Sequence, residues 1–369
     1  MDAFRSSEHL FNYVVKDGDK LNLLYRDVNA GTVVTKMRTP LILPVLLLGF
    51  LPARGQEGPL ARVQELLQAG QAKQALTIVA TLDPNVRQQP LMQHLTGLAH
   101  YQLGDYLQAV TFLASSFAQA AKGTSQRIQA AQLVGMSHYF LNRFAEALPY
   151  LAELEGSPLD TAETQYVRGI CQLQTQNVQE ARRTFARMFA VPADSASSRL
   201  INAQMMIRQN LEELAVQELQ GALALDPRLP QVRFLLGELA IYKSDLDGGI
   251  ELLKQEIEIN PGFAMAYYRL GEAYGRQQRW DEAIPPLQKS IWLNPFFSGP
   301  FIVLGKAYLK KGDNTNAENI LKRALSMDVN NYSGHYLLAQ VYQKTGRMEE
   351  ARKEFQTAER LRPNSNQPQ

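Results

Sequence analysis

The chain has 369 residues, of which 45% are hydrophobic and 20% are charged, and its formal net charge is +2. This balance excludes a predominantly disordered chain, and it lacks the basic excess with which proteins attract phosphates, so we expect no nucleic-acid partner. The single Cys171 cannot form an internal disulfide, and the five histidines show no HExxH or CxxC spacing. We therefore expect neither a metal site nor a cofactor.

Residues 37–55 consist of a basic start, an apolar run and a small-residue ending. This order is typical of a signal peptide, and the apolar run is shorter than the ~20 residues of a membrane span. We therefore expect an exported protein, periplasmic or secreted, with no stable membrane span in the mature chain. Residues 1–36 show no periodic pattern and are expected to be a disordered leader, or to lie upstream of a true start at Met37. The alternative is a genuine cytoplasmic extension followed by a short core or interfacial helix.

Small residues then recur along the chain with a period of 34. Seven of the eight intervals in the main series equal 34, and the interval from Ala109 to Ala147 is 38. We expect its four extra residues in the polar loop around residues 121–124. The main series comprises Ala75, Ala109, Ala147, Ala181, Ala215, Gly249, Ala283, Ala317 and Ala351. A second series keeps the same step and comprises Gly97, Gly135, Gly169, Ala203, Gly237, Gly271, Gly305 and Ala339.

Small residues at regular spacing are expected where two helices pack closely, because a larger side chain would push their axes beyond roughly 8–10 Å. Turn residues such as Lys311-Gly312-Asp313 separate the two series, and prolines such as Pro261 and Pro295 close several units. The sequence therefore predicts an all-α array of about nine helix-turn-helix units over residues 56–363. Its last helix, near 348–361, is rich in charge, and residues 364–369 are expected to be a disordered tail.

Three units carry the clearest pattern of larger residues around these small ones. The sets are Tyr267, Leu270, Gly271, Tyr274, Ala283, Leu287 and Pro295; then Phe301, Leu304, Gly305, Tyr308, Ala317, Leu321 and Ala324; then Leu338, Ala339, Tyr342, Ala351, Phe355, Ala358 and Pro363. They resemble the tetratricopeptide repeat family. The resemblance implies a right-handed superhelix, an α-solenoid whose inner groove is lined by the first helix of each hairpin, and a role in protein–protein interaction. Arg168 and Asn202 replace the family's usual leucine, so we expect less regular hairpins there.

Aromatic residues recur on the side of the first helices that the resemblance places inward. They are Tyr166, Phe234, Tyr268 and Tyr336, and multiples of 34 separate them. Tyrosine and phenylalanine give a large contact area at low entropic cost, which suits a peptide-binding groove. The alternative is that these rings only pack the repeats against each other, as most aromatic stripes at helical spacing do.

Polar and charged residues are expected beside this row. Glu272 and Gln340 follow Tyr268 and Tyr336 by one helical turn, and four cations belong near the same surface: Arg276, Lys306, Lys310 and Lys344. Together they favour a partner that carries acidic groups. A solvated charged face explains them nearly as well.

No catalytic site is expected. Cys171 reads as a small core residue, and no residues remain for a catalytic domain once the repeats are assigned. The leading hypothesis is a scaffold or adaptor that binds a protein or peptide in the groove. Its rival is an exported binder of a carbohydrate or lipid-linked substrate, because aromatic rows also stack on sugar rings.

Overall fold

The computed structural model describes residues 58–362, which form 19 α-helices joined by turns and loops. They fall into two units, one ending at Glu218 and the other beginning at Leu219. The helices up to the boundary are α4 (Pro59–Gln68), α5 (Ala72–Thr81), α6 (Pro84–Arg87), α7 (Pro90–Gln102), α8 (Tyr106–Gln119), α9 (Ser125–Phe140), α10 (Phe144–Ala152), α11 (Ala162–Gln174), α12 (Val178–Met188), α13 (Ala196–Arg208) and α14 (Glu212–Leu225), which crosses it. Unit 2 continues with α15 (Val232–Tyr242), α16 (Leu246–Ile259), α17 (Ala264–Arg276), α18 (Trp280–Leu293), α19 (Ser298–Lys311), α20 (Asn314–Met327), α21 (Tyr332–Lys344) and α22 (Met348–Leu361).

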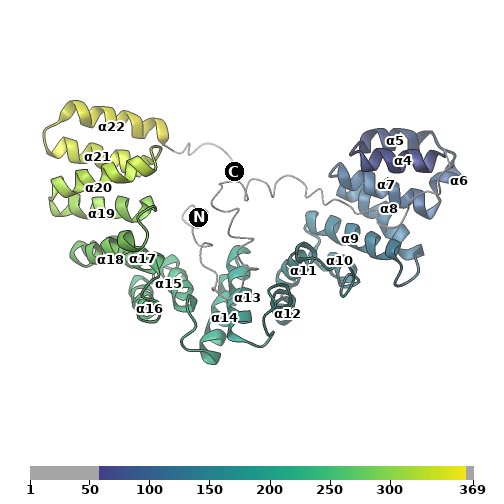
Figure 1. The fold of residues 1–369 in the computed structure, drawn as a ribbon, viewed down its shortest axis with the longest axis horizontal. Coiled ribbons are helices and arrows are strands. Elements are labelled where there is room, and N and C mark those ends of the chain that lie inside the picture. The colour runs from purple at the N-terminus through teal and green to yellow at the C-terminus, as the bar shows by residue number, and fades with distance from the viewer. Residues whose placement is uncertain (1–57, 363–369) are drawn as a thin grey trace. The chain divides into compact units, whose positions relative to one another are not determined.

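This is the predicted all-α fold, with helices packed in pairs like tetratricopeptide helix-turn-helix repeats (Figure 1). Apart from the single turn of α6, the described helices form nine consecutive hairpins. The expected leader (1–36), signal peptide (37–55) and tail (364–369) lie outside the described residues, as do both ends of the 56–363 array. Export therefore stays a prediction.

The close contact expected at the small residues is confirmed within the hairpins. Each glycine of the second series faces a large residue sixteen positions later on the second helix of its hairpin. The pairs are Gly97 with Leu113, Gly135 with Leu151, Gly169 with Phe185, Gly237 with Leu253, Gly271 with Leu287 and Gly305 with Leu321. A Cβ atom at Gly271 would lie 2.5 Å from Leu287 Cγ, so the missing side chain leaves the space that the leucine fills.

The turn inside each hairpin places one residue in the left-handed region. These residues are Gly70, Gly104, Asn142, Gln176, Asn210, Ser244, Gln278, Gly312 and Gly346, with φ between 56° and 80°. Glycine adopts this conformation without strain, whereas a side chain makes it unfavourable. Five of the nine turns therefore carry a residue that is less suited to its backbone than glycine.

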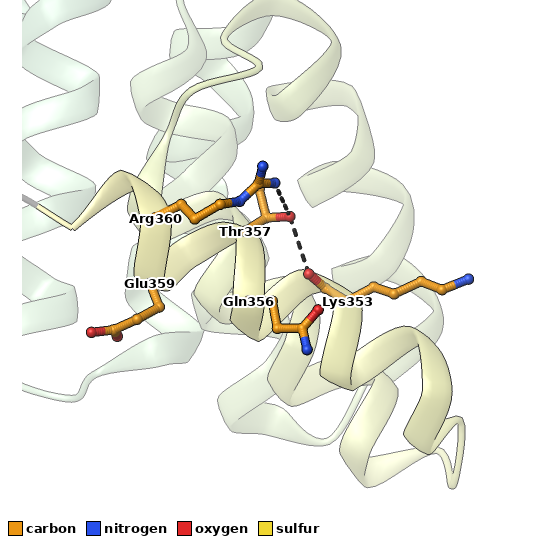
Figure 2. A pocket seen from close by; sticks show the side chains of 5 residues that line it. All are labelled: Lys353, Gln356, Thr357, Glu359 and Arg360. Atoms are coloured by element: carbon orange, nitrogen blue, oxygen red, sulfur yellow. Dashed lines mark hydrogen bonds between the residues drawn. The ribbon is translucent and has the colours of Figure 1, made fainter.

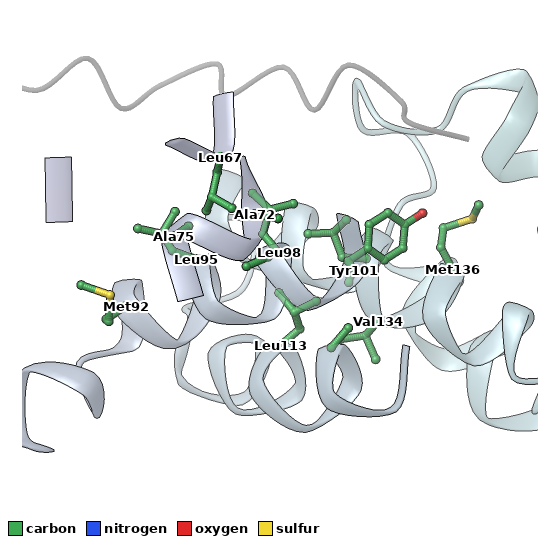
Figure 3. Packing of buried hydrophobic residues seen from close by; sticks show 14 of the residues in the cluster. Leu67, Ala72, Ala75, Met92, Leu95, Leu98, Tyr101, Leu113, Val134 and Met136 are labelled. Atoms are coloured by element: carbon green, nitrogen blue, oxygen red, sulfur yellow. The ribbon is translucent and has the colours of Figure 1, made fainter. Parts of the chain in front are cut away.

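Within each unit the first helices also contact one another. In unit 1, α4 contacts α7, α7 contacts α9, and α9 contacts α11; in unit 2, α15, α17, α19 and α21 do so in order. The apolar core runs between the hairpins, and Figure 3 shows part of it in unit 1, where Leu98 and Leu113 pack among residues of neighbouring helices. In unit 2 the first helices α17, α19 and α21 each keep exposed side chains, among them Arg276, Lys306 and Tyr336.

The predicted position of the four extra residues is only partly right. The loop after α8 spans residues 120–124, one residue longer than the four-residue loop before α21. The other three lengthen the first helix of the hairpin, since α9 has 16 residues and α21 has 13. Thr124 caps the longer helix, its side chain accepting a hydrogen bond from the backbone N–H of Arg127.

The expected irregularity occurs near Arg168 but not at Asn202, since α13 and α14 have the same lengths as α21 and α22. The second helix α10 has 9 residues, includes Pro149, and is followed by a long loop over residues 153–161. Arg168 is buried, and its guanidinium donates a hydrogen bond of 3.3 Å to the carbonyl of Leu151 in the last turn of α10. Asp160 lies 3.2 Å from the same guanidinium and balances its charge. The buried cation thus adds a hydrogen bond to a carbonyl that also accepts one from the backbone N–H of Leu154.

Replacing Gly271 by alanine is expected to lower the free energy of unfolding by about 1–3 kcal/mol, because the new methyl group must displace Leu287. The matched control is Gly262→Ala in the loop before α17, where an added Cβ meets nothing within 4 Å. Urea denaturation followed by circular dichroism measures both. Equal stability of the two variants would show that the glycine contact does not set the helix spacing.

Replacing Gln278 by glycine is expected to raise the free energy of unfolding by about 1 kcal/mol, because Gln278 holds φ at 60°. Gln277, its neighbour at φ −80°, is the control, and glycine there is expected to be destabilising. The same denaturation experiment reads both changes, and a stabilising Gln277→Gly or a destabilising Gln278→Gly would contradict the strain argument.

Candidate partner-binding surface

The predicted site residues all lie on first helices. Tyr166 is on α11 in unit 1, and Phe234 is on α15 in unit 2. The rest occupy the following first helices of unit 2: Tyr268, Glu272 and Arg276 on α17, Lys306 and Lys310 on α19, and Tyr336, Gln340 and Lys344 on α21. Because α15, α17, α19 and α21 contact one another in order, the unit 2 residues lie on neighbouring helices. We call the side of these helices that carries Arg276, Lys310 and Lys344 the first-helix face.

The aromatic row is interrupted by burial. Phe234 is only 3% exposed and its ring meets Phe263 edge-on at 4.9 Å, so it packs in the core and is not available to a partner. Tyr268 is half-buried against Phe297 in the same edge-on way at 5.3 Å, and burial raises the pKa of its hydroxyl. In both cases a phenylalanine from the loop before the next first helix covers the ring. Tyr336 differs, because it is 41% exposed.

Tyr166, the unit 1 member of the row, is half-buried. Its ring lies 6.5 Å from that of Phe185, and its hydroxyl interacts with the guanidinium of Arg208 on α13. Tyr166 therefore joins α11, α12 and α13, which is the packing role that the alternative hypothesis gave to it.

A network of charges joins α15 to α17 on the first-helix face. Arg269 donates to both oxygens of Glu238, with distances of 2.9 and 2.8 Å from its Nε, and to Glu272 at 2.7 Å. Arg276 lies 3.5 Å from Glu272. Burial raises the pKa of Glu238, although the guanidinium of Arg269 opposes the shift. The two carboxylates are thus engaged within the protein and leave the outer cation, Arg276, exposed.

Exposed cations continue this surface on α19 and α21. Arg276, Lys310 and Lys344 are separated by 34 residues and so occupy the same position on three successive first helices; we call them the basic row. Lys306 lies one turn before Lys310, with its ammonium 5.9 Å from the centre of the Trp280 ring. The Lys344 ammonium lies 3.5 Å from the carbonyl of Leu309 at the end of α19. Neither α19 nor α21 contains an Asp or Glu, so no carboxylate on these helices opposes the row.

Sequence reasoning missed two residues of this face. Arg269 follows Tyr268 directly and is the residue that neutralises Glu238 and Glu272, a pairing across helices that no spacing in the sequence reveals. Tyr242 is 46% exposed and precedes Arg276 by 34 residues. The repeat period could have found Tyr242, because on α15 it occupies the repeat position that the basic row occupies on α17, α19 and α21.

Two other features among residues 58–362, a buried thiol and a depression on α22, do not suit catalysis. Cys171 is buried, and burial raises the pKa of its thiol to about 12, so it stays protonated and is a poor nucleophile. A depression on α22 is lined by Lys353, Gln356, Thr357, Glu359 and Arg360. All five belong to one helix, and Figure 2 shows Lys353 and Glu359 extending in different directions, so the depression does not enclose a ligand.

Models of known families match most of the helical array. Two tetratricopeptide repeat models match residues 234–295 and 308–369. The chain therefore contains tetratricopeptide repeats. Residues 36–207 match a third family model, the N-terminal domain of the ESX-1 type VII secretion system protein EccA1, and this match includes the segment predicted to be a signal peptide. Tetratricopeptide repeats and the EccA1 N-terminal domain are binding modules without catalytic activity. No curated protein matches the sequence.

Solved structures resemble parts of this repeat protein. MamA from Desulfovibrio magneticus is 18% identical, and the likeness covers 47% of this chain and 98% of that one, with a TM-score of 0.44. YrrB, described as a TPR protein with an unusual peptide-binding site, is 17% identical over 51% of this chain and 95% of its own, with a TM-score of 0.44. The C-terminal part of a TPR protein from Cytophaga hutchinsonii is 16% identical over 63% and 95%, again with a TM-score of 0.44.

Proposed function

We propose that this tetratricopeptide repeat protein is a scaffold whose first-helix face in unit 2 binds an acidic, extended segment of a partner protein. The observation that carries the proposal is the row of exposed cations on successive first helices, Arg276, Lys310 and Lys344. Repeat modules of this kind bind other proteins on extended surfaces.

The distribution of charge in unit 2 supports an acidic partner. The first helices α15, α17, α19 and α21 carry seven Lys and Arg residues and two carboxylates, both of which pair with Arg269. The second helices α16, α18, α20 and α22 carry seven Lys and Arg residues and eleven carboxylates. Cations are therefore in excess on the first helices only, and complementary charge on a partner gives specificity for this side.

The spacing of the basic row favours a particular pattern in the partner. Helices in contact lie roughly 8–10 Å apart, and an extended chain rises about 3.3 Å per residue. One residue in three of an extended segment would then meet a cation of the basic row. Tyr336, which is 41% exposed on the same face, adds apolar contact area beside Lys344.

A carbohydrate ligand is less well supported. Stacking on sugars requires a series of exposed ring faces, whereas Phe234 is buried and Tyr268 is half-buried against Phe297. The exposed groups that repeat along this face are ammonium and guanidinium groups. They suit carboxylates better than neutral sugar hydroxyls.

The proposal predicts that a peptide with Glu at every third position binds the full chain more tightly than a peptide with Gln at those positions. Lys310→Gln combined with Lys344→Gln should weaken this binding about tenfold at low salt, since an exposed ion pair contributes up to about 1 kcal/mol. Fluorescence anisotropy of the labelled peptide at two salt concentrations measures the affinity, which should fall as salt rises.

The control variant combines Arg352→Gln and Lys353→Gln, two exposed cations on the second helix α22. It makes the same change in net charge away from the first-helix face. Equal loss of affinity in the two double variants would mean that the peptide responds only to net charge, and the proposal would then be wrong.

A further inference from the structure

Two aromatic residues at the end of α18 are the most exposed large apolar side chains among residues 58–362. Trp292, in the last turn of α18, is 71% exposed, and Phe296, in the loop that follows, is 88% exposed. Exposing rings of this size to water is unfavourable, and nothing in the packing of the hairpins requires it. They lie on a second helix and its following loop, apart from the basic row on the first helices.

The repeat itself shows that these aromatics are not needed for the fold. The equivalent positions one repeat earlier and later than Trp292 hold Glu258 and Ser326. Gly262 and Asn330 occupy the positions equivalent to Phe296. Neighbouring hairpins therefore form the same helix end and loop with polar or small residues. Trp292 and Phe296 therefore differ from the residues at the equivalent positions, and the stability of the hairpin does not require them.

A cation lies beside the Trp292 ring. The Lys289 ammonium lies 3.9 Å from the centre of the Trp292 ring. The equivalent loop of the next repeat adds an exposed Val329, 68% accessible. From residue 283 to residue 312 the sequence holds four lysines and no Asp or Glu. Trp292 and Phe296 thus stand in a stretch of the chain that carries only positive charge.

We propose that Trp292, Phe296 and Lys289 form a contact for an anionic lipid bilayer, with the two rings in the headgroup region and the ammonium beside lipid phosphates or carboxylates. Tryptophan prefers this region because its ring is apolar and its N–H is polar, and each lysine near an anionic membrane contributes about 1 kcal/mol. Two large side chains that project into solvent can enter a bilayer without a preformed cavity. Among residues 58–362, no helix has the length and apolar character of a membrane span.

The test uses the full chain with Trp280→Phe, so that Trp292 is the remaining one of the chain's two tryptophans. Vesicles of phosphatidylcholine mixed with phosphatidylserine should shift its fluorescence emission to shorter wavelength, and brominated lipids should quench it. Phosphatidylcholine vesicles alone should have a much smaller effect. Because residues 1–57 contain no tryptophan, the signal reports this site even if another segment also touches the membrane.

The variant Trp292→Ser with Phe296→Asn introduces the side chains of the next repeat and should retain the fold. In co-sedimentation it should reduce partitioning onto the anionic vesicles about tenfold or more, and Lys289→Gln should reduce it about fivefold. The control is Met348→Ser, which alters an exposed apolar residue at the start of α22.

Unchanged emission with anionic vesicles, or equal partitioning of the double variant and wild type, would overturn the lipid proposal. If the fluorescence emission of Trp292 changes with a soluble partner protein and not with vesicles, the two rings belong to a protein interface instead. Neither result depends on the acidic peptide, which binds a different set of residues.

Discussion

Close packing inside each hairpin is the constraint on which the rest of this structure depends. A glycine on the first helix and a leucine or phenylalanine sixteen residues later on the second occupy complementary space, as in the pair Gly271 and Leu287. Because the contact recurs in six of the nine hairpins, the helices keep similar spacing and orientation from one repeat to the next. Residues 34 apart then come to lie in rows, so a repeat in sequence becomes a repeat in surface chemistry.

Such rows give the first and second helices of unit 2 different surface charges. In unit 2 the second helices hold most of the carboxylates, whereas α19 and α21 on the other side carry lysines and no acidic residue. Arg269 pairs with Glu238 and Glu272, the two carboxylates of the first helices in unit 2. Its bond to Glu238 also links α17 to α15. The cations of the basic row therefore stay available on a surface that packing holds in place.

The sequence was sufficient for the repeat, the helix pairs and the residues at their contacts, because each depends on a period that a single chain displays. It was less informative about details that depend on local competition. Three of the four extra residues after Ala109 lengthen α9, since residues 125–127 are as compatible with a helix as with a loop. Phe234 fits both a groove and a core, and only the position of Phe263 against its ring decides that it is buried. The partners of Arg269 lie on two helices, which spacing alone does not reveal.

The most direct test of the account is hydrogen–deuterium exchange of the full chain with and without the acidic peptide that has Glu at every third position. The account predicts slower exchange in α17, α19 and α21 when the peptide is bound, at a level that falls with added salt, and little change in α18, α20 and α22. Protection confined to the second helices, or to unit 1, would contradict the claim that the first-helix face of unit 2 is the binding surface.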